Sequence, residues 1–318
     1  MIYELALTPG LFSENDNSFS LPSLHNLLYA IVKDNHLIGV VRKKLWRPAV
    51  YKAIASLEDP FRERIGKLLN TLKDRGRIIP RQYQTNIGNP LENDLSWLHE
   101  FLLAHRENPF NAIVTSLTSH ENYDGSTDCV YDVKSILDAP MLQNYERSKQ
   151  VKRETPEFIK MLKPLLRYSR SILLIDPHIN PTVQRYKKPI TGIINKAFDR
   201  GRYPAPAFFE IHLKASKDIS EQEQEYKENL TPLMNRGTKV RVVLWAEWEN
   251  QETFHNRFIL TDLCGIKVGQ GLDEPKHGGP DHDDWDVMGE THRQKIWCQF
   301  QKGSTTFDRK HEFNLTPP

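Results

Sequence analysis

Cysteine, long apolar runs and an excess of either charge are all scarce in this chain of 318 residues. The three cysteines, Cys129, Cys264 and Cys298, lie far apart and are odd in number. Their spacing fits neither a zinc site nor a disulfide framework, so a reducing, cytoplasmic environment is expected. No segment approaches the ~18 uninterrupted apolar residues of a membrane span, and the first residues do not resemble an export signal. We therefore expect a protein without membrane insertion.

Positive and negative charges are nearly balanced overall, with 43 Lys and Arg against 41 Asp and Glu. Net charge therefore neither favours nor excludes a nucleic-acid partner. Residues 42–81 differ from the rest, because twelve basic residues face four acidic ones there, interleaved with aromatic side chains. The basic patch of Arg42, Lys43, Lys44 and Arg47 could follow a phosphate backbone. It could equally be the solvated face of two amphipathic helices, and the sequence leaves both interpretations open.

The length exceeds that of one typical domain and predicts two. A polar stretch at 143–154 without apolar periodicity is the best boundary. Residues 1–145 mix helical and strand patterns, including a helix over 58–76 ended by Gly76 and a loop over 77–93, and predict a mixed α/β domain. Residues 150–318 begin with a helix capped by Thr155 and then alternate strand and helix from 171 to 246. The fold class expected for the whole chain is α/β.

One motif in the second half carries chemistry. Residues 254–262 read FHNRFILTD, and Gly269 follows, giving the spacing H-x-R-x4-D-x6-G. Side chains alternate along a strand, so His255 and Arg257 are expected on one face, with Phe258 on the other. A histidine and a cation delivered together suit chemistry on a phosphate group.

This spacing resembles the signature of the phospholipase D superfamily, H-x-K-x4-D-x6-G, in a single copy within a stretch of half-domain size, residues 150–300. The resemblance implies an α/β/α half-domain and a metal-independent phosphodiesterase without a cofactor, active as a homodimer. His255 would attack phosphorus to give a phosphohistidine, and a second histidine would protonate the leaving oxygen. Arg257 would hold the phosphate oxygens, and Asp262, the third catalytic-motif residue, would anchor the strand end.

The motif also departs from the family pattern. Arg257 stands in place of Lys, Gln270 in place of Ser, and Leu272 in place of Asn, unless Asp273 takes part through a shifted register. These changes keep a second hypothesis open, a catalytically inactive module that binds phosphate, lipid or protein. Asp176 and His178 follow a strand and form a second rank of candidates with Gln270 and Asp273.

Two other patterns are given less weight. His212 begins an H-x-K-x3-D sequence that is one residue short, which we interpret as chance. Residues 273–286 hold six carboxylates and two histidines, but their spacing matches no metal-site template, so a solvated loop and no metal are expected. The leading prediction is a nuclease with a nucleic-acid partner, serving microbial defence or DNA processing.

Overall fold

The computed structural model describes residues 2–13, 20–84, 91–125, 127–249, 252–277 and 281–317. The chain divides into two compact units, Ile2–Tyr145 and Glu146–Pro318. The division falls inside the polar stretch at 143–154. Both units combine sheets and helices, so the expected α/β class is confirmed.

The N-terminal unit is built on a five-stranded sheet in the order β3-β2-β1-β4-β5. Every strand pair in it is parallel. The strands are β1 (Glu4–Leu7), β2 (Leu37–Val40), β3 (Ile78–Pro80), β4 (Ala112–Thr115) and β5 (Val130–Asp132). The strand order runs outward from β1 in one direction and then restarts beside β1 with β4. This reversal is the topological switch point of a doubly wound sheet.

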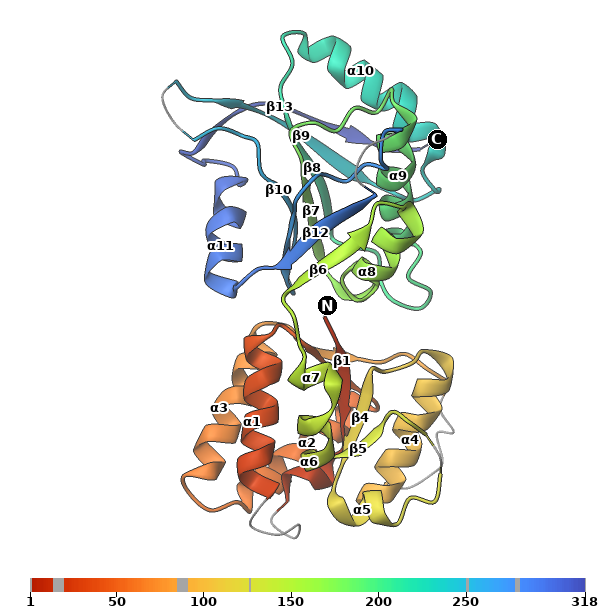
Figure 1. Cartoon of the computed structure of the whole chain (residues 1–318), viewed down its shortest axis with the longest axis vertical. Coiled ribbons are helices and arrows are strands. Elements are labelled where there is room, and N and C mark those ends of the chain that lie inside the picture. Colours follow the sequence, from red (N-terminus) through yellow and green to blue (C-terminus); the bar gives the residue numbers. More distant parts are fainter. Residues whose placement is uncertain are drawn as a thin grey trace. The chain divides into compact units, whose positions relative to one another are not determined.

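Helices cover this sheet on both faces, as Figure 1 shows for the lower unit. They are η1 (Pro9–Phe12), α1 (Ser20–Lys33), α2 (Lys43–Ala55), α3 (Phe61–Asp74), α4 (Asp94–Glu107), α5 (Leu117–Glu121), α6 (Val133–Asp138) and α7 (Pro140–Gln143). Helix α1 packs against α3 and α6, and α4 packs against β4 and η1. All four residues of β1, of β2 and of β4 are buried, as expected for parallel strands covered on both faces.

The C-terminal unit contains an eight-stranded sheet in the order β13-β9-β8-β7-β10-β11-β12-β6. Strands β7, β8 and β9 are parallel, and the remaining pairs are antiparallel. The strands are β6 (Ser148–Lys152), β7 (Ser171–Ile175), β8 (Phe208–Lys214), β9 (Val240–Glu247), β10 (Arg257–Thr261), β11 (Gly265–Val268), β12 (His282–Val287) and β13 (Phe307–Leu315).

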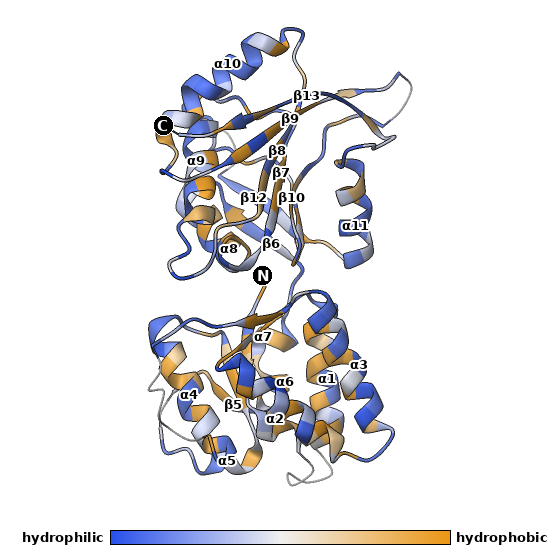
Figure 2. Cartoon of the chain, turned by 180° about the vertical axis from the view of Figure 1, so that it is seen from behind, coloured by the Kyte–Doolittle hydropathy of each residue, from blue (hydrophilic) through white to orange (hydrophobic). Residues whose placement is uncertain are grey.

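Helices flank this sheet unequally. Helices α8 (Thr155–Tyr168), α9 (Gln184–Phe198) and α10 (Ile219–Leu230), followed by η2 (Thr231–Leu233), lie on one side, and α11 (Glu290–Gln299) lies on the other (Figure 1). Beneath α11 an apolar cluster includes Phe258, Leu260 and Trp245. In Figure 2 the strands of this unit are largely apolar and the outer faces of its helices are hydrophilic, most clearly in α10.

Several local expectations were wrong. The stretch 77–93 was read as a loop, but its described part contains β3; residues 85–90 lie outside the described residues. The polar stretch 143–154 contains β6, an exposed edge strand with only Val151 buried, so it lacks the apolar signal of a central strand. Glu154 occupies the N-cap position of α8 without a side-chain capping bond, and Thr155 lies inside the helix, where its hydroxyl donates to Glu274 at 2.8 Å. Gly76 does adopt the left-handed conformation, with φ 67°.

Candidate functional site

His255 and Arg257 lie at the start of β10, but only Arg257 belongs to the strand. The strand begins at Arg257, so His255 belongs to the segment that precedes it. The alternation argument therefore applies to Arg257 and not to His255, a correction to the sequence interpretation. Phe258 and Leu260 are buried in the cluster under α11, which places Arg257 on the opposite face of the sheet.

His255 is exposed, and its ring is oriented by the neighbouring Thr253. Its Nδ1 lies 3.1 Å from the Thr253 carbonyl oxygen and 2.8 Å from the Thr253 hydroxyl. The carbonyl only accepts, so it bonds Nδ1 when Nδ1 carries the proton, whereas the hydroxyl can either donate to Nδ1 or accept from it. In the tautomer protonated at Nδ1, the lone pair of the neutral imidazole lies at Nε2.

Glu247 ends β9 and is tied to the segment that holds His255. Its carboxylate accepts hydrogen bonds from Lys214 Nζ and from the backbone N–H of Phe254, both at 2.8 Å. The Lys214 bond contributes most to lowering the pKa of Glu247, and the Phe254 N–H adds to it. Residues at the ends of β8 and β9 therefore converge on the segment that holds His255.

Arg257 faces Asp176, the residue that follows β7. Its Nε lies 3.5 Å from Asp176 Oδ1, and its Nη1 donates to the Gly269 carbonyl at 3.2 Å. The register pairs Phe258 with Ile175, so the start of β10 lies beside the carboxyl end of β7. Part of the Arg257 charge is consequently balanced by a carboxylate within the protein.

Asp176 is fully buried and also accepts backbone hydrogen bonds from His178 at 2.9 Å and Leu272 at 3.4 Å. Burial raises the pKa of this carboxyl, and it outweighs the lowering by the His178 N–H and by Arg257. His178 itself is exposed. The Asp176 carboxyl is thus a desolvated group whose charged form is favoured by the His178 N–H and by Arg257.

Asp273 is buried, at 2% exposure, and takes part in the same constellation. Its carboxylate pairs with Arg153 at 2.7 Å and also with Arg185 of α9. Gly271, at φ +128°, allows the close approach: a Cβ there would lie 3.1 Å from Asp273 Oδ1, 3.2 Å from Asp176 Oδ2 and 3.3 Å from Arg257 Nε. Asp176, Asp273, Arg153, Arg185 and Arg257 therefore form an ionic cluster, called here the buried ionic cluster because its two carboxylates and Arg153 are buried. Buried Asp283 also interacts electrostatically with Arg153.

Three residues in or beside this cluster were not predicted from the sequence: Arg153, Arg185 and Tyr186. Arg153 follows β6, and Arg185 stacks its guanidinium 4.3 Å from the centroid of the Tyr186 ring. Burial first, and then the charge of Asp273, raise the pKa of Tyr186. An arginine next to a polar boundary carries no recognisable sequence signal, because its partner Asp273 is 120 positions away.

The other motif residues lie elsewhere. Asp262 follows the far end of β10, where its Oδ1 accepts from the backbone N–H of Arg170 at 2.9 Å and of Ser171 at 3.0 Å. These bonds tie β10 to β7, so Asp262 is an anchor and does not hydrogen-bond His255. Gln270 is exposed, and its backbone N–H donates to Asp283 at 2.7 Å.

The two patterns given less weight can also be placed. His212 is buried against Trp245, whose indole N–H donates to His212 Nδ1 at 3.0 Å, so it cannot form a second exposed motif. The stretch 273–286 is not simply a solvated loop, because it contains buried Asp273 and β12; residues 278–280 lie outside the described residues. Within the described parts of the chain, no three His, Cys, Asp or Glu side chains are grouped to hold a metal ion.

The basic patch of the N-terminal unit is divided by the fold. Arg42 precedes α2 and pairs with buried Glu100, with Nε 2.8 Å from Oε1. Lys44 is exposed, and Lys43 and Arg47 are partly exposed on α2. Arg42 was therefore wrongly grouped with surface cations, because its charge is used inside the unit.

Comparisons with known proteins add little. No protein-family model matches the chain, and no curated protein matches it. A solved structure described as TrmBL2, an archaeal chromatin protein with a novel mode of DNA binding, aligns over 80% of this chain and 87% of its own, at 14% identity and a TM-score of 0.27. That likeness is too low to support an argument on fold or function. Among the described residues, no helix combines the length and apolar character needed to cross a bilayer.

Proposed function

We propose that the C-terminal unit is a phosphodiesterase of the phospholipase D type, in which His255 is the nucleophile. The observation that carries the proposal is the 3.1 Å contact between His255 Nδ1 and the Thr253 carbonyl. When Nδ1 donates to this carbonyl, the lone pair of this exposed histidine lies at Nε2, as nucleophilic attack requires. The H-x-R-x4-D-x6-G spacing supports the same assignment.

The reaction would proceed in two displacements. His255 Nε2 donates its lone pair to phosphorus, a P–N bond forms and the bond to the leaving oxygen breaks as a second histidine supplies a proton to that oxygen. Water then attacks phosphorus, gives a proton back to the second histidine, and the P–N bond breaks. No redox step or cofactor is required.

The buried ionic cluster would supply the electrostatic part of catalysis. Of its three guanidinium groups, that of Arg257 belongs to a side chain that is 23% exposed. A fixed cation beside the site of attack stabilises the charge that develops on phosphate oxygens. We assign this role to Arg257, with Asp176 holding its guanidinium in place.

The second histidine has two possible sources. In a homodimer with twofold symmetry, His255 of the second copy could face the first across the axis. Within one chain, exposed His178 beside Asp176 is the alternative. Static light scattering with parallel activity measurements separates them, because turnover by a strictly monomeric protein would require His178.

Nucleic acid is the proposed substrate, which makes the enzyme a nuclease. Lys43, Lys44 and Arg47 on α2 would contribute affinity through the phosphate backbone. Arg42 is excluded from this role by its pairing with Glu100.

The test is cleavage of single- and double-stranded DNA and RNA in EDTA by wild type, His255→Ala and His99→Ala. His99 is an exposed histidine on α4 and serves as the matched control. We expect His255→Ala to abolish turnover and His99→Ala to retain it. An acid-labile phosphoenzyme in wild type that is absent from His255→Ala would identify the intermediate, whereas equal activity of the two variants would refute the assignment.

A second candidate function is an inactive phosphate-binding module. The specific observation in its favour is that Arg257 is already engaged by Asp176 and by the Gly269 carbonyl. This alternative predicts that Arg257→Ala weakens the binding of oligonucleotides or anionic liposomes, while no phosphodiester is turned over by the wild-type protein.

A further inference from the structure

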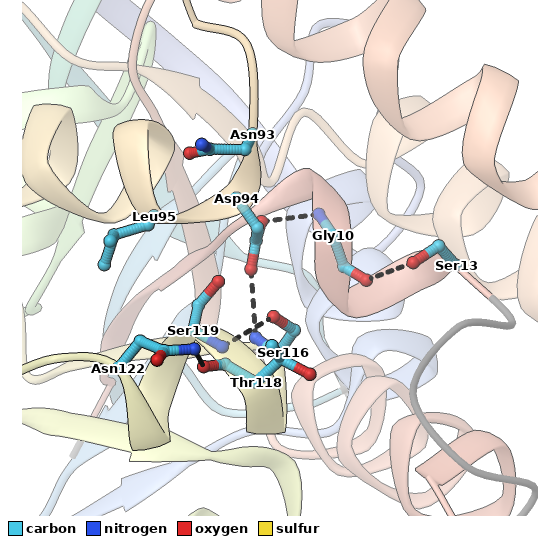
Figure 3. Close-up of a pocket in the computed structure, with 9 residues that line it drawn as sticks. All are labelled: Gly10, Ser13, Asn93, Asp94, Leu95, Ser116, Thr118, Ser119 and Asn122. Atoms are coloured by element: carbon cyan, nitrogen blue, oxygen red, sulfur yellow. Dashed lines mark hydrogen bonds between the residues drawn. The ribbon is translucent and has the colours of Figure 1, made fainter.

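The N-terminal unit contains a cavity of about 550 Å³ that the sequence did not indicate. Its lining comes from the segments that follow β1 and β4 and from the start of α4 (Figure 3). Strands β1 and β4 are the two neighbours between which the strand order reverses. In open parallel sheets the crevice outside the carboxyl ends of such strands is the usual place for a ligand. The volume is within the range of small-molecule sites.

The floor of the cavity is fixed by Asp94, the first residue of α4. Its Oδ2 accepts hydrogen bonds from the hydroxyls of Thr8 and Thr115, both at 2.9 Å, and from the Ser116 N–H at 3.1 Å. Its Oδ1 accepts from the Gly10 N–H at 2.6 Å. One carboxylate therefore links the ends of β1 and β4, and these hydrogen bonds fix its position at the floor of the cavity.

Ser119 provides the group that most directly points to a ligand. The residue is only 6% exposed and lines the cavity, and its hydroxyl makes no hydrogen bond to the described residues. In Figure 3 this hydroxyl points into the space between Leu95 and Asp94. A hydroxyl that has no protein partner and faces a cavity is available to a bound water or ligand.

Two further polar groups complement Ser119. The Ser116 oxygen accepts from the Ser119 N–H at 3.3 Å, which leaves the Ser116 hydroxyl proton available to donate. Asn122 donates its Nδ2 to the Thr118 carbonyl at 2.7 Å, which leaves its amide oxygen as an acceptor at the rim. The cavity thus offers hydroxyl donors and an amide acceptor, beside an apolar surface from Leu95.

The lining also indicates which ligands do not fit. None of the described lining residues is Lys, Arg or His. The segment after β1 reads TPGLFS, with one glycine, so the glycine-rich turn that cradles a pyrophosphate is missing. With the Asp94 carboxylate in the wall, an anionic group would be repelled and a neutral one favoured.

We infer that this cavity binds a neutral ligand with a hydroxylated sugar ring, of the size of a ribonucleoside or a monosaccharide. Sugar hydroxyls both donate and accept, so a pair of them can accept from Ser116 and Ser119 and donate to Asn122 and to the second lone pair of Asp94 Oδ1. This site is separate from the ionic cluster and does not depend on the proposed phosphodiesterase.

Isothermal titration calorimetry of the full chain tests the inference, with the four common ribonucleosides, their 2′-deoxy counterparts, ribose and glucose as probes up to millimolar concentration. We expect saturable binding of at least one hydroxylated probe. If nucleosides are the ligands, loss of one sugar hydroxyl should weaken binding by about tenfold or more, because a polar partner is left unsatisfied. If ribose or glucose binds and the nucleosides do not, the ligand is a free sugar and not a nucleoside.

Two variants connect binding to the cavity. Ser119→Leu should fill it and abolish binding, and Ser119→Ala should weaken binding by about two- to tenfold through loss of one hydrogen bond. Ser169→Ala is the matched control, because Ser169 of the C-terminal unit is also buried with an unpartnered hydroxyl. Circular dichroism verifies that each variant is folded. The inference is overturned if no probe binds, or if Ser119→Ala and Ser119→Leu both bind like the wild type.

Discussion

The two units place polar groups at the carboxyl ends of parallel strands but stabilise them in different ways. In the N-terminal unit, one carboxylate, Asp94, is held entirely by neutral hydroxyl and N–H donors. In the C-terminal unit, Asp273 is held by the guanidinium groups of Arg153 and Arg185, and Asp176 by two backbone N–H groups and by Arg257. A wall of neutral donors suits a neutral ligand, whereas guanidinium groups suit an anion. Similar strand arrangements can therefore serve different chemistry.

The largest expected effect concerns the ionic cluster. Replacing Asp273 by Ala removes the buried carboxylate that pairs with Arg153, whose side chain is 6% exposed, and with Arg185. We expect a loss of about 3 to 5 kcal/mol in the free energy of unfolding, since removing one partner of a buried ion pair is strongly destabilising. Urea denaturation measures this loss.

The matched control for that variant is Asp199→Ala in the same unit. Asp199 pairs with Lys196 at 3.3 Å, but its side chain is 67% exposed. Its replacement should change stability by less than about 0.5 kcal/mol. Equal effects of the two substitutions would show that the buried cluster does not hold the C-terminal unit together.

Asp94→Ala tests the N-terminal unit, where neutral hydrogen-bond donors hold a carboxylate. The variant leaves the hydroxyls of Thr8 and Thr115, which are both fully buried, without their shared acceptor. We expect a loss of about 2 to 4 kcal/mol, less than for Asp273 because no charge is stranded. The loss of stability in Asp94→Ala should not change with added salt, whereas the loss in the Asp273 variant should depend on salt. Urea denaturation of both variants at low and high salt makes this comparison.

A third prediction concerns pH and the N-terminal unit. Burial chiefly lowers the pKa of His36 from 6.5 to about 3, so the folded state keeps this histidine neutral. Below the unfolded pKa the unfolded chain binds a proton that the folded chain does not. The free energy of unfolding therefore decreases as the pH is lowered from about 6.5 to about 3. The contribution lost by about pH 5 should be about 2 kcal/mol.

Urea unfolding of wild type and His36→Gln at about pH 7.5 and about pH 5 measures this contribution. The variant should lose less stability on acidification than the wild type. His99→Gln, which changes an exposed histidine of the same unit, should behave as the wild type does. Identical pH profiles for wild type and His36→Gln would remove His36 as the acid-sensitive group.

The smallest effect on stability is expected for the surface cations of α2. Replacing Lys43, Lys44 and Arg47 by Ala should change unfolding by less than about 0.5 kcal/mol each. If they contact a phosphate backbone, the salt slope of oligonucleotide binding should fall by about 0.7 to 0.9 per contact. Arg42→Ala provides the contrast, because it should destabilise the unit by removing the cation that pairs with buried Glu100 and leaving that carboxylate with the Tyr83 hydroxyl. An unchanged salt slope would identify α2 as an ordinary solvated face.

Some of these features followed from local sequence. The alternation of strands and helices in residues 171–246 predicted their order correctly, and Gly76 marked a left-handed turn because few other residues adopt that conformation. Edge strands such as β6 were missed, since one exposed face and few buried residues give no apolar pattern. The position of β10 was predicted, but its first residue was not, so the orientation of His255 could not be derived by alternation.

The sequence by itself determined the α/β class, the boundary near residue 145 and the presence of a histidine, an arginine and an aspartate in fixed spacing. Those properties are local, because they depend on periodicity and on neighbours within a few positions. Only the tertiary structure decided that Arg153 and Arg185 meet Asp273, that Arg42 is turned inward to Glu100, and that a hydroxyl-lined cavity lies between the ends of β1 and β4. Each of these contacts joins residues dozens of positions apart, so strand order and burial, which no local pattern encodes, determine which charges and hydroxyls come together.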